Sequence, residues 1–246
     1  DITRRLQSQC FMCQLLYTPA GEKQVKADKK GGAKMNLKVE GYPVGYMATN
    51  CYLVTDTQSG ERFIVDPGTY DASLKKLLQN VKAGELRYIL LTHGHFDHIM
   101  GVYDVQKNYG GKIVIHEKDA DCFTNEEKSL LDTFGFDGKL PQKADIIVKD
   151  GDVLPFADGG IEVMHTPGHT EGSVCYLVQD KIFSGDTLFY GSVGRTDFKS
   201  GSSADILKSV RRLASLEGDR KVYPGHNMLT TLDNERRHNV YLKDAK

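Results

Sequence analysis

The sequence lacks a surplus of charge and a long apolar run, and each absence narrows the range of functions. The 246 residues carry 32 Lys and Arg against 33 Asp and Glu, a formal net charge of −1. No global positive field therefore exists to hold nucleic acid or an anionic membrane surface. No stretch approaches the ~20 apolar residues that span a bilayer, and the N-terminus lacks the basic start and apolar centre of a secretory signal. We expect a cytoplasmic protein with no nucleic-acid or membrane partner.

The sequence also lacks the cysteine framework of a disulfide scaffold. Its five cysteines are an odd number without regular spacing, which fits a reducing compartment. Cys51, Cys122 and Cys175 stand in apolar or mixed surroundings and are interpreted as packing residues. Cys10 and Cys13 have the spacing of half a zinc knuckle or a redox pair, but no second Cys-x-x-Cys completes a four-sulfur site. A short apolar turn or helix is the simpler interpretation of that pair.

What is present is the composition of a globular protein, with 39% hydrophobic and 26% charged residues and 25 glycines. The first 34 residues differ from the rest, because they contain seven Lys and Arg but only three Asp and Glu, a formal charge of +4. Their Lys- and Gly-rich end reads as a linker, and Met35 is a natural start for the core. We predict a basic N-terminal extension or linker of unknown role over 1–34 and one domain over 35–246.

Strand-like and helix-like segments alternate through this domain, as expected for sheets that helices must cover. Runs rich in β-branched and aromatic residues predict strands over 50–55, 62–65, 87–92, 112–115, 146–148, 161–165, 173–178, 181–184 and 221–223. Apolar residues at helical spacing predict helices over 71–82, capped by Asp71, over about 203–216, capped by Ser202 or Ser203, and from about Thr231. The pattern favours an α/β sandwich of two mixed sheets packed face to face, with helices on the outer faces (αββα).

Three histidines and one aspartate stand within six residues, directly after the apolar run 88–91. His93 and His95 can project toward one point, while Asp97 and His98, at an expected helix start, turn toward a second. A single tetrahedral metal could not use all four groups, so the spacing suggests two metal ions. A plain polar loop is the alternative, but such loops favour Gly, Ser, Asn and Asp over a histidine cluster.

Three further metal-competent residues follow later strands. His169, Asp186 and His226 each come after a predicted strand and a tight turn that contains glycine. Such turns at strand ends place side chains from distant segments along one edge of the sheets. We expect these residues to converge on the 93–98 cluster.

At these residues the chain resembles the metallo-β-lactamase superfamily, whose His-x-His-x-Asp-His loop and later His, Asp and His ligands are all matched in order. Segments 50–54 and 64–68 also resemble the first strands and turn of that family. The resemblance implies the metallo-β-lactamase fold and two divalent metal ions, most simply Zn²⁺, with Fe²⁺ or Mn²⁺ also suited to such ligands. It assigns His93, His95 and His169 to the first metal, Asp97, His98 and His226 to the second, and Asp186 to the bridge.

The resemblance further implies a hydrolase in which a metal-bound hydroxide attacks a carbonyl, with Asp97 and Asp186 as catalytic carboxylates. β-Lactamases of subclass B1 carry a cysteine near the position of Asp186, whereas thioester hydrolases of the glyoxalase II group carry the bridging aspartate. A secreted, antibiotic-destroying enzyme is therefore not expected.

Segment 194–198 is similar to that of small glyoxalase II-like (hydroxyacylglutathione hydrolase-like) proteins that lack a C-terminal helical domain. Arg195 matches a basic position that contacts glutathione, but Thr196 and Asp197 stand where typical glyoxalase II has aromatic residues. Only 20 residues follow His226, so we expect the separate glutathione-binding domain to be absent. The expected partner is a small-molecule thioester such as a hydroxyacylglutathione. The alternatives are an iron-dependent persulfide dioxygenase using only His93, His169 and Asp186, and a hydrolase of lactones or phosphoesters.

Two alternatives from other classes are an RNA-processing nuclease, opposed by the charge and the lack of an inserted basic block, and a non-catalytic metal-binding module. Outside the ligand set, Asp66 is expected to support a ligand from its turn. His165 is expected to support a ligand or to pack in the core, His116 to cap or hydrogen-bond locally, and His238 to lie on a solvated helix face. The sequence does not predict the oligomeric state.

Overall fold

The structure is a computed structural model that describes residues 35–135 and 138–242. The extension predicted over 1–34, with Cys10 and Cys13, lies outside the described residues. Within the described ranges, no helix is both long and apolar enough to cross a membrane.

The first sheet has six strands in the order β1-β2-β3-β4-β5-β6. β1, β2 and β3 pair antiparallel, and β3 to β6 run parallel. Their bounds are Leu37–Val44, Thr49–Asp56, Arg62–Val65, Leu86–Leu90, Lys112–His116 and Ile146–Val148. The parallel strands are nearly continuous apolar runs because both of their faces are covered.

The second sheet has six strands in the order β14-β13-β10-β9-β8-β7. β7 to β10 pair antiparallel, β10 and β13 run parallel, and β14 closes the edge. The bounds in chain order are Val153–Phe156 (β7), Gly159–His165 (β8), Val174–Val178 (β9), Lys181–Gly185 (β10), Lys221–Pro224 (β13) and Thr230–Thr231 (β14), and the separate pair is Leu188–Phe189 (β11) with Ser192–Val193 (β12).

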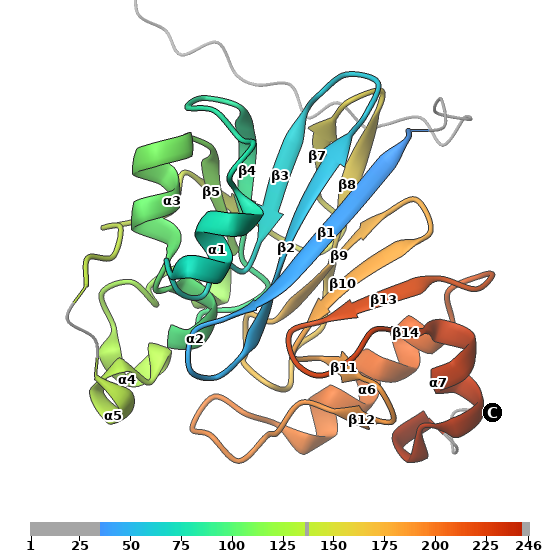
Figure 1. The fold of residues 1–246 in the computed structure, drawn as a ribbon. Coiled ribbons are helices and arrows are strands. Elements are labelled where there is room, and N and C mark those ends of the chain that lie inside the picture. Colours follow the sequence, from blue (N-terminus) through green and yellow to red (C-terminus); the bar gives the residue numbers. More distant parts are fainter. Residues whose placement is uncertain (1–34, 136–137, 243–246) are drawn as a thin grey trace, which may run out of the picture. The chain divides into compact units, whose positions relative to one another are not determined.

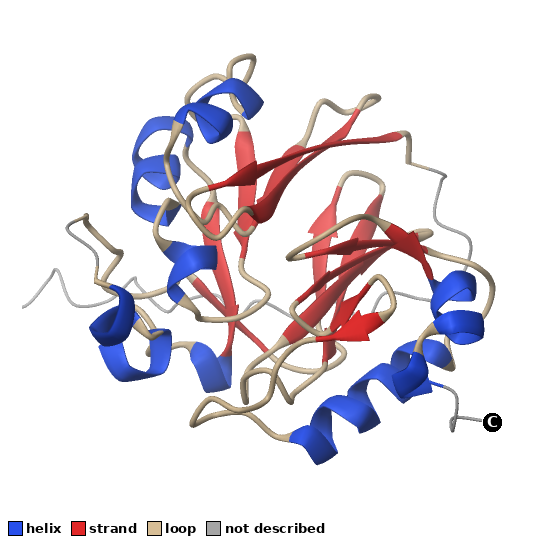
Figure 2. Ribbon diagram, turned by 60° about the horizontal axis from the view of Figure 1, so that its bottom comes forward, coloured by secondary structure: helices blue, strands red, loops and turns tan. Residues whose placement is uncertain are grey.

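The two sheets face each other across an apolar core, and helices lie outside both (Figures 1 and 2). Phe63, Phe156 and Phe183 are fully buried in that core and meet edge to face. The helices that pack outside the first sheet include α1 (Ala72–Leu77) and α3 (Val102–Tyr109), and those outside the second are α6 (Ser203–Ala214) and α7 (Leu232–His238). The predicted αββα sandwich is therefore confirmed.

The remaining short helices lie on the side of the first sheet. They are α2 (Phe96–Ile99), α4 (Glu126–Ser129) and α5 (Leu131–Phe134), with a 3₁₀ turn at Glu117–Asp119. The 3₁₀ turn at Val240–Leu242 instead packs with α6 and α7 outside the second sheet. α2 begins at Phe96, one residue before the helix start expected at Asp97 or His98.

The helix predicted over 71–82 is shorter than expected. Asp71 caps it as predicted, accepting a hydrogen bond from the backbone N–H of Leu74, but α1 ends at Leu77. Leu78 and Val81 lie in the turns that follow α1, and their side chains are nevertheless buried, as the apolar spacing predicted. Spacing alone could not separate a helix from a turn that buries the same side chains, and Asn80 favours the turn.

Candidate metal centre

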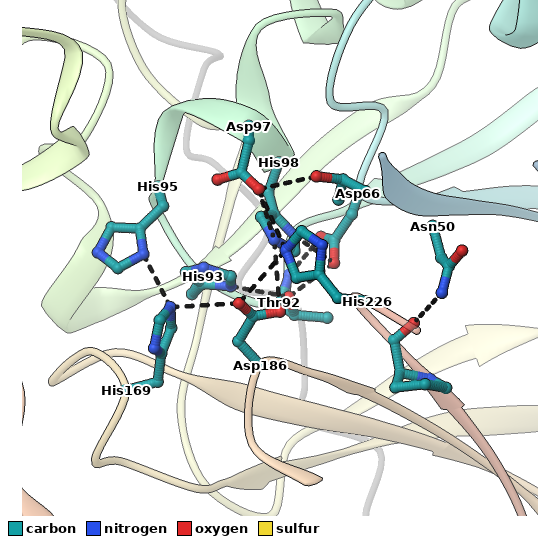
Figure 3. A network of polar contacts seen from close by, with 12 residues as sticks. Asn50, Asp66, Thr92, His93, His95, Asp97, His98, His169, Asp186 and His226 are labelled. Atoms are coloured by element: carbon teal, nitrogen blue, oxygen red, sulfur yellow. Dashed lines mark hydrogen bonds and ion pairs between the residues drawn. The ribbon is translucent and has the colours of Figure 1, made fainter. Parts of the chain in front are cut away.

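All seven predicted ligand residues converge at one edge of the two sheets (Figure 3). The cluster from His93 to His98 follows β4, whereas His169 follows β8. Asp186 comes directly after β10, and His226 comes two residues after β13, the parallel neighbour of β10. Because these strands are embedded in the core, their ends fix the positions of the side chains.

His93, His95 and His169 form the first group, and one ring nitrogen from each lies within 4.8 Å of the others. Nδ1 of His95 and Nε2 of His169 are 2.9 Å apart. His169 Nδ1 donates to the backbone oxygen of Arg195 at 2.8 Å, so its Nε2 carries a free lone pair. His93 Nε2 is buried and has no hydrogen-bond partner.

Asp97, His98 and His226 form the second group. His226 Nε2 is 3.2 Å and His98 Nε2 is 3.5 Å from Oδ2 of Asp97. His98 Nδ1 donates to Asp66 at 2.9 Å, which leaves its Nε2 buried and without a hydrogen-bond partner. Buried unpaired polar atoms are costly in a folded protein. Their convergence here fits the donor set of a metal site.

Asp186 lies between the two groups. One carboxylate oxygen, Oδ2, is 3.5 Å from Nε2 of His169 and 3.5 Å from Nε2 of His226, and Oδ1 is 3.5 Å from Nε2 of His98. Donor atoms bound at 2.0–2.1 Å to a tetrahedral ion are roughly 3.3 Å apart. The spacings around Asp186 and Asp97 therefore fit two adjacent ions that share the Asp186 carboxylate.

The protonation pattern also fits a cation site. Burial lowers the pKa values of His93 and His95, and neighbouring histidines lower them further. Burial also opposes charge on His98, but Asp97, Asp66 and Asp186 outweigh it and raise the pKa of His98 to about 10. Burial opposes the charge of Asp97, yet His98 and His226 hold its pKa well below the usual range. The environment thus favours neutral rings at His93 and His95 and a charged carboxylate at Asp97, which attracts a cation.

Asp66 supports the centre from the turn after β3, at a positive φ of 49°. Its carboxylate accepts hydrogen bonds from the backbone N–H and the hydroxyl of Thr92 at 2.8 and 2.7 Å, as well as from His98. The Thr92 hydroxyl gives its only proton to Asp66, so it accepts from Nδ1 of His93 at 3.1 Å. Asp66 thereby orients ligands of both groups.

Two supporting residues were missed in the sequence. Asp119 is buried and accepts hydrogen bonds from Gly94 N at 3.0 Å, Thr170 Oγ1 at 2.7 Å and Gly172 N at 3.1 Å. It therefore connects the loop of His93 and His95 with the loop of His169. Thr49 is fully buried and donates to Asp97 Oδ2 at 2.7 Å. Neither stands in a motif, so no local signal marked them.

Gly225 explains why a glycine precedes His226. A Cβ at this position would lie 2.2 Å from Oδ1 of Asp186 and 2.8 Å from Cε1 of His98. Both distances are shorter than any van der Waals contact, so the backbone can approach the centre only without a side chain.

Arg195, which is predicted to contact the substrate, makes contacts within the protein through both its side chain and its backbone. Its guanidinium makes two hydrogen bonds to Asp197, at 2.7 and 2.6 Å, and lies over the ring of Phe198. The contact of Arg195 with the centre comes from its backbone oxygen, which accepts a hydrogen bond from Nδ1 of His169.

The other predicted histidines lie outside the ligand set. His165 neither supports a ligand nor lies in the core, because it stacks on His116 at 4.1 Å and bonds to the backbone oxygen of Glu171. His116 caps the following 3₁₀ turn by accepting from Lys118 N, as expected, and His238 is exposed. Cys51, Cys122 and Cys175 are buried and free, as predicted for packing residues.

Sequence comparison identifies relatives that this chain matches over almost their whole length. An uncharacterized protein of Mycobacterium leprae is 35% identical over 223 residues, covering 84% of this chain and 99% of the relative. Hydroxyacylglutathione hydrolase GloC of Haemophilus influenzae is 31% identical over 214 residues, covering 84% of this chain and 98% of the relative.

Solved structures show the same fold. The BLEG-1 B3 metallo-beta-lactamase superposes with a TM-score of 0.76 at 31% identity, covering 83% of this chain and 99% of that one. TTHA1623 in a di-iron-bound form gives 0.68 at 30% identity, covering 82% of this chain and all of that one. The sequence profile of the Metallo-beta-lactamase superfamily matches residues 44–226, a range that holds all seven candidate ligands. The chain belongs to the metallo-beta-lactamase superfamily.

Proposed function

We propose that this protein is a dinuclear metal-dependent hydrolase of thioesters. The observation that carries the proposal is the position of Asp186, with its carboxylate 3.5 Å from donor nitrogens of both ligand groups. A carboxylate in that position suits two ions held side by side. A non-catalytic metal-binding module would not need the two ions to share a ligand.

In this proposal His93, His95 and His169 would hold one ion, Asp97, His98 and His226 would hold the other, and Asp186 would be shared between them. When bound, two such ions would lower the pKa of a water toward neutrality and polarise the substrate carbonyl. The carboxylates of Asp97 and Asp186 would help to retain the cations and to orient the water. Asp66 and Thr92 keep the histidine rings in place, so little reorganisation is needed at the moment of reaction.

Zinc is our first choice for the metal, because histidine nitrogens and carboxylate oxygens are ordinary zinc ligands. Iron is the main competitor, since the same ligands suit it and the similar TTHA1623 structure is described in a di-iron-bound form. The proposed setting is the cytoplasm, where a reducing environment keeps buried thiols such as Cys51 free.

The thioester assignment has support from the relative named hydroxyacylglutathione hydrolase. The similarity to BLEG-1 makes β-lactam hydrolysis a competitor that must be tested directly. A mononuclear persulfide dioxygenase is less well supported, because it would leave His98 and His226 without a role although both lie 3.5 Å from Asp186.

The test combines metal analysis with a substrate panel. We expect about two metal ions per chain and hydrolysis of thioesters that chelation abolishes and zinc or iron restores. Asp186→Asn should lose both metal and activity, whereas Asp158→Asn, which removes an exposed carboxylate, should lose neither. Metal-stripped protein that cleaves thioesters at the original rate would contradict the proposal. So would a preference for β-lactams, or oxygen uptake with a persulfide.

A further inference from the structure

An apolar hollow of about 290 Å³ adjoins the candidate metal centre. The β1–β2 turn lines one side of it, and α2 with the end of α5 lines the other. Its lining is Val44, Gly45, Tyr46, Met47, Thr69, Phe96, Asp97, Met100, Phe134 and Gly135. Among the described residues of that lining, Asp97, a candidate ligand, is the only carboxylate, and no basic side chain is present, so the hollow adjoins the second ligand group and is otherwise mostly apolar.

Several apolar side chains of this hollow are exposed to an unusual degree. Tyr46 is completely exposed, Met47 is 43% exposed and Phe134 is 51% exposed. Phe134 stacks on Phe96, with ring centroids 4.4 Å apart. Clustered exposed apolar surface beside a reactive site commonly marks a ligand-binding groove.

A second hollow, also of about 290 Å³, lies beside Phe198 and has a different character. Phe198 packs against the rings of His95 and His169, on the side of the first ligand group. The charged residues that line this hollow are Glu127, Lys128, Glu171 and Lys199. The two hollows thus differ in polarity and adjoin opposite ligand groups.

The cations near the second hollow already have acidic partners. Lys199 pairs with Glu127, and Lys128 pairs with Asp121. Arg195, which precedes the lining residue Phe198 by three positions in the sequence, pairs with Asp197. An anionic thiol such as glutathione would have to displace these partners, which lowers the benefit of its negative charges.

A thioester has two arms, an acyl chain and a thiol, that leave the carbonyl in different directions. With the carbonyl at the metal centre, one arm can enter each hollow. We propose that the apolar hollow binds the acyl arm and that the enzyme prefers thioesters with an extended apolar acyl chain over the short hydroxyacyl groups of hydroxyacylglutathione. This inference rests on the proposed hydrolase function and names the substrate class.

The test is the dependence of hydrolysis on acyl length. Acetyl, butyryl and octanoyl thioesters of one small neutral thiol are compared on the metal-loaded protein. Each methylene that enters the hollow contributes about 0.8 kcal/mol, or roughly fourfold in kcat/KM. We therefore expect kcat/KM to rise about 15-fold from acetyl to butyryl and to rise again for octanoyl.

Two variants test whether the hollow is responsible. Met47→Ser and Phe134→Ser replace half-exposed side chains, and each should reduce the octanoyl to acetyl ratio by about tenfold. Their rates with the acetyl thioester should fall far less than their rates with the octanoyl thioester. Tyr241→Ser is the matched control, because Tyr241 is 42% exposed and does not line either hollow.

Calorimetric binding of acetate and octanoate separates this inference from the proposed function. If octanoate binds more tightly and Phe134→Ser removes the difference, the hollow is an acyl site even if no thioester is cleaved, and only the hydrolase proposal falls. If octanoate binds no more tightly than acetate, the inference is overturned whatever the protein hydrolyses. A flat or falling chain-length profile with active enzyme also overturns it.

Discussion

Asp66 accepts a hydrogen bond from Nδ1 of His98 at 2.9 Å, and both side chains are buried. The same carboxylate binds the backbone and hydroxyl of Thr92 and therefore fixes the start of the ligand loop. A carboxylate behind a metal-ligating imidazole orients the ring and raises its basicity. Asp66 thus controls the second ligand group without being a ligand.

Asp66→Asn should weaken binding of the second metal ion by about 10- to 100-fold, because the amide orients His98 less strongly. Asn tolerates the left-handed backbone at this position, so the loop should keep its shape. Isothermal titration calorimetry with zinc measures the affinity of each of the two binding steps. Asp152→Asn is the control, since Asp152 caps a surface turn by accepting from Lys149 N. Unchanged affinity of both sites in Asp66→Asn would show that the hydrogen bond has no influence on the metal.

Asp119→Ala should destabilise the protein by about 3 kcal/mol. It leaves the buried N–H groups of Gly94 and Gly172 without acceptors, and each costs about 1–3 kcal/mol. Urea unfolding of the metal-free protein measures this change apart from metal binding. Asp158→Ala, at an exposed position, should change the free energy of unfolding by less than about 0.5 kcal/mol. A similarly small change for Asp119→Ala would mean that the two ligand loops hold their positions independently.

Gly225→Ala should abolish binding of at least one metal ion, because the new methyl group would overlap Oδ1 of Asp186. We expect activity to fall by more than about 100-fold, the scale on which small displacements at an active site act. Gly60→Ala is the control, since its methyl group would enter open space and would strain only the backbone, at a positive φ of 77°, so metal content should not change. Metal analysis by mass spectrometry, with activity, compares the two variants. Full metal content in Gly225→Ala would mean that the loop of His226 can move away.

The sequence predicted the centre well because its ligands stand at strand ends, and strands are the most regular part of this chain. His93 to His98 follow an apolar run, and Asp186 follows another, so local patterns located both. The αββα layers followed from the same alternation of strands and helices. These features depend on neighbours in sequence, which a single sequence contains.

Asp119 and Thr49 could not be predicted in this way. Asp119 lies 51 residues from Thr170, and Thr49 lies 48 residues from Asp97. Their roles arise only when the chain folds and brings separate loops together. The predicted substrate contact of Arg195 stays a prediction, and Asp197, which pairs with the guanidinium, would compete with a ligand for it.

His116 should make stability depend on pH between about 6.5 and 4. Its side chain is buried, and burial followed by repulsion from His165 lowers the pKa of His116 to about 4. In the unfolded chain His116 has a pKa near 6.5. Between about pH 6.5 and pH 4 the unfolded chain therefore binds a proton at His116 that the folded chain does not bind. Stability from this group is complete above about pH 6.5 and is lost as the pH falls toward 4.

The size of this effect can be isolated with His116→Asn, which can still accept from Lys118 N but does not titrate. Between pH 7 and pH 5 the original protein should lose about 2 kcal/mol more of its unfolding free energy than this variant. Urea unfolding of metal-free samples at several pH values measures both curves. His238→Gln removes an exposed histidine and should leave the slope unchanged. Parallel curves for the original protein and His116→Asn would mean that the stacked pair with His165 accepts a proton without cost. In that case both reasons given for the low pKa of His116, its burial and the repulsion from His165, would be wrong.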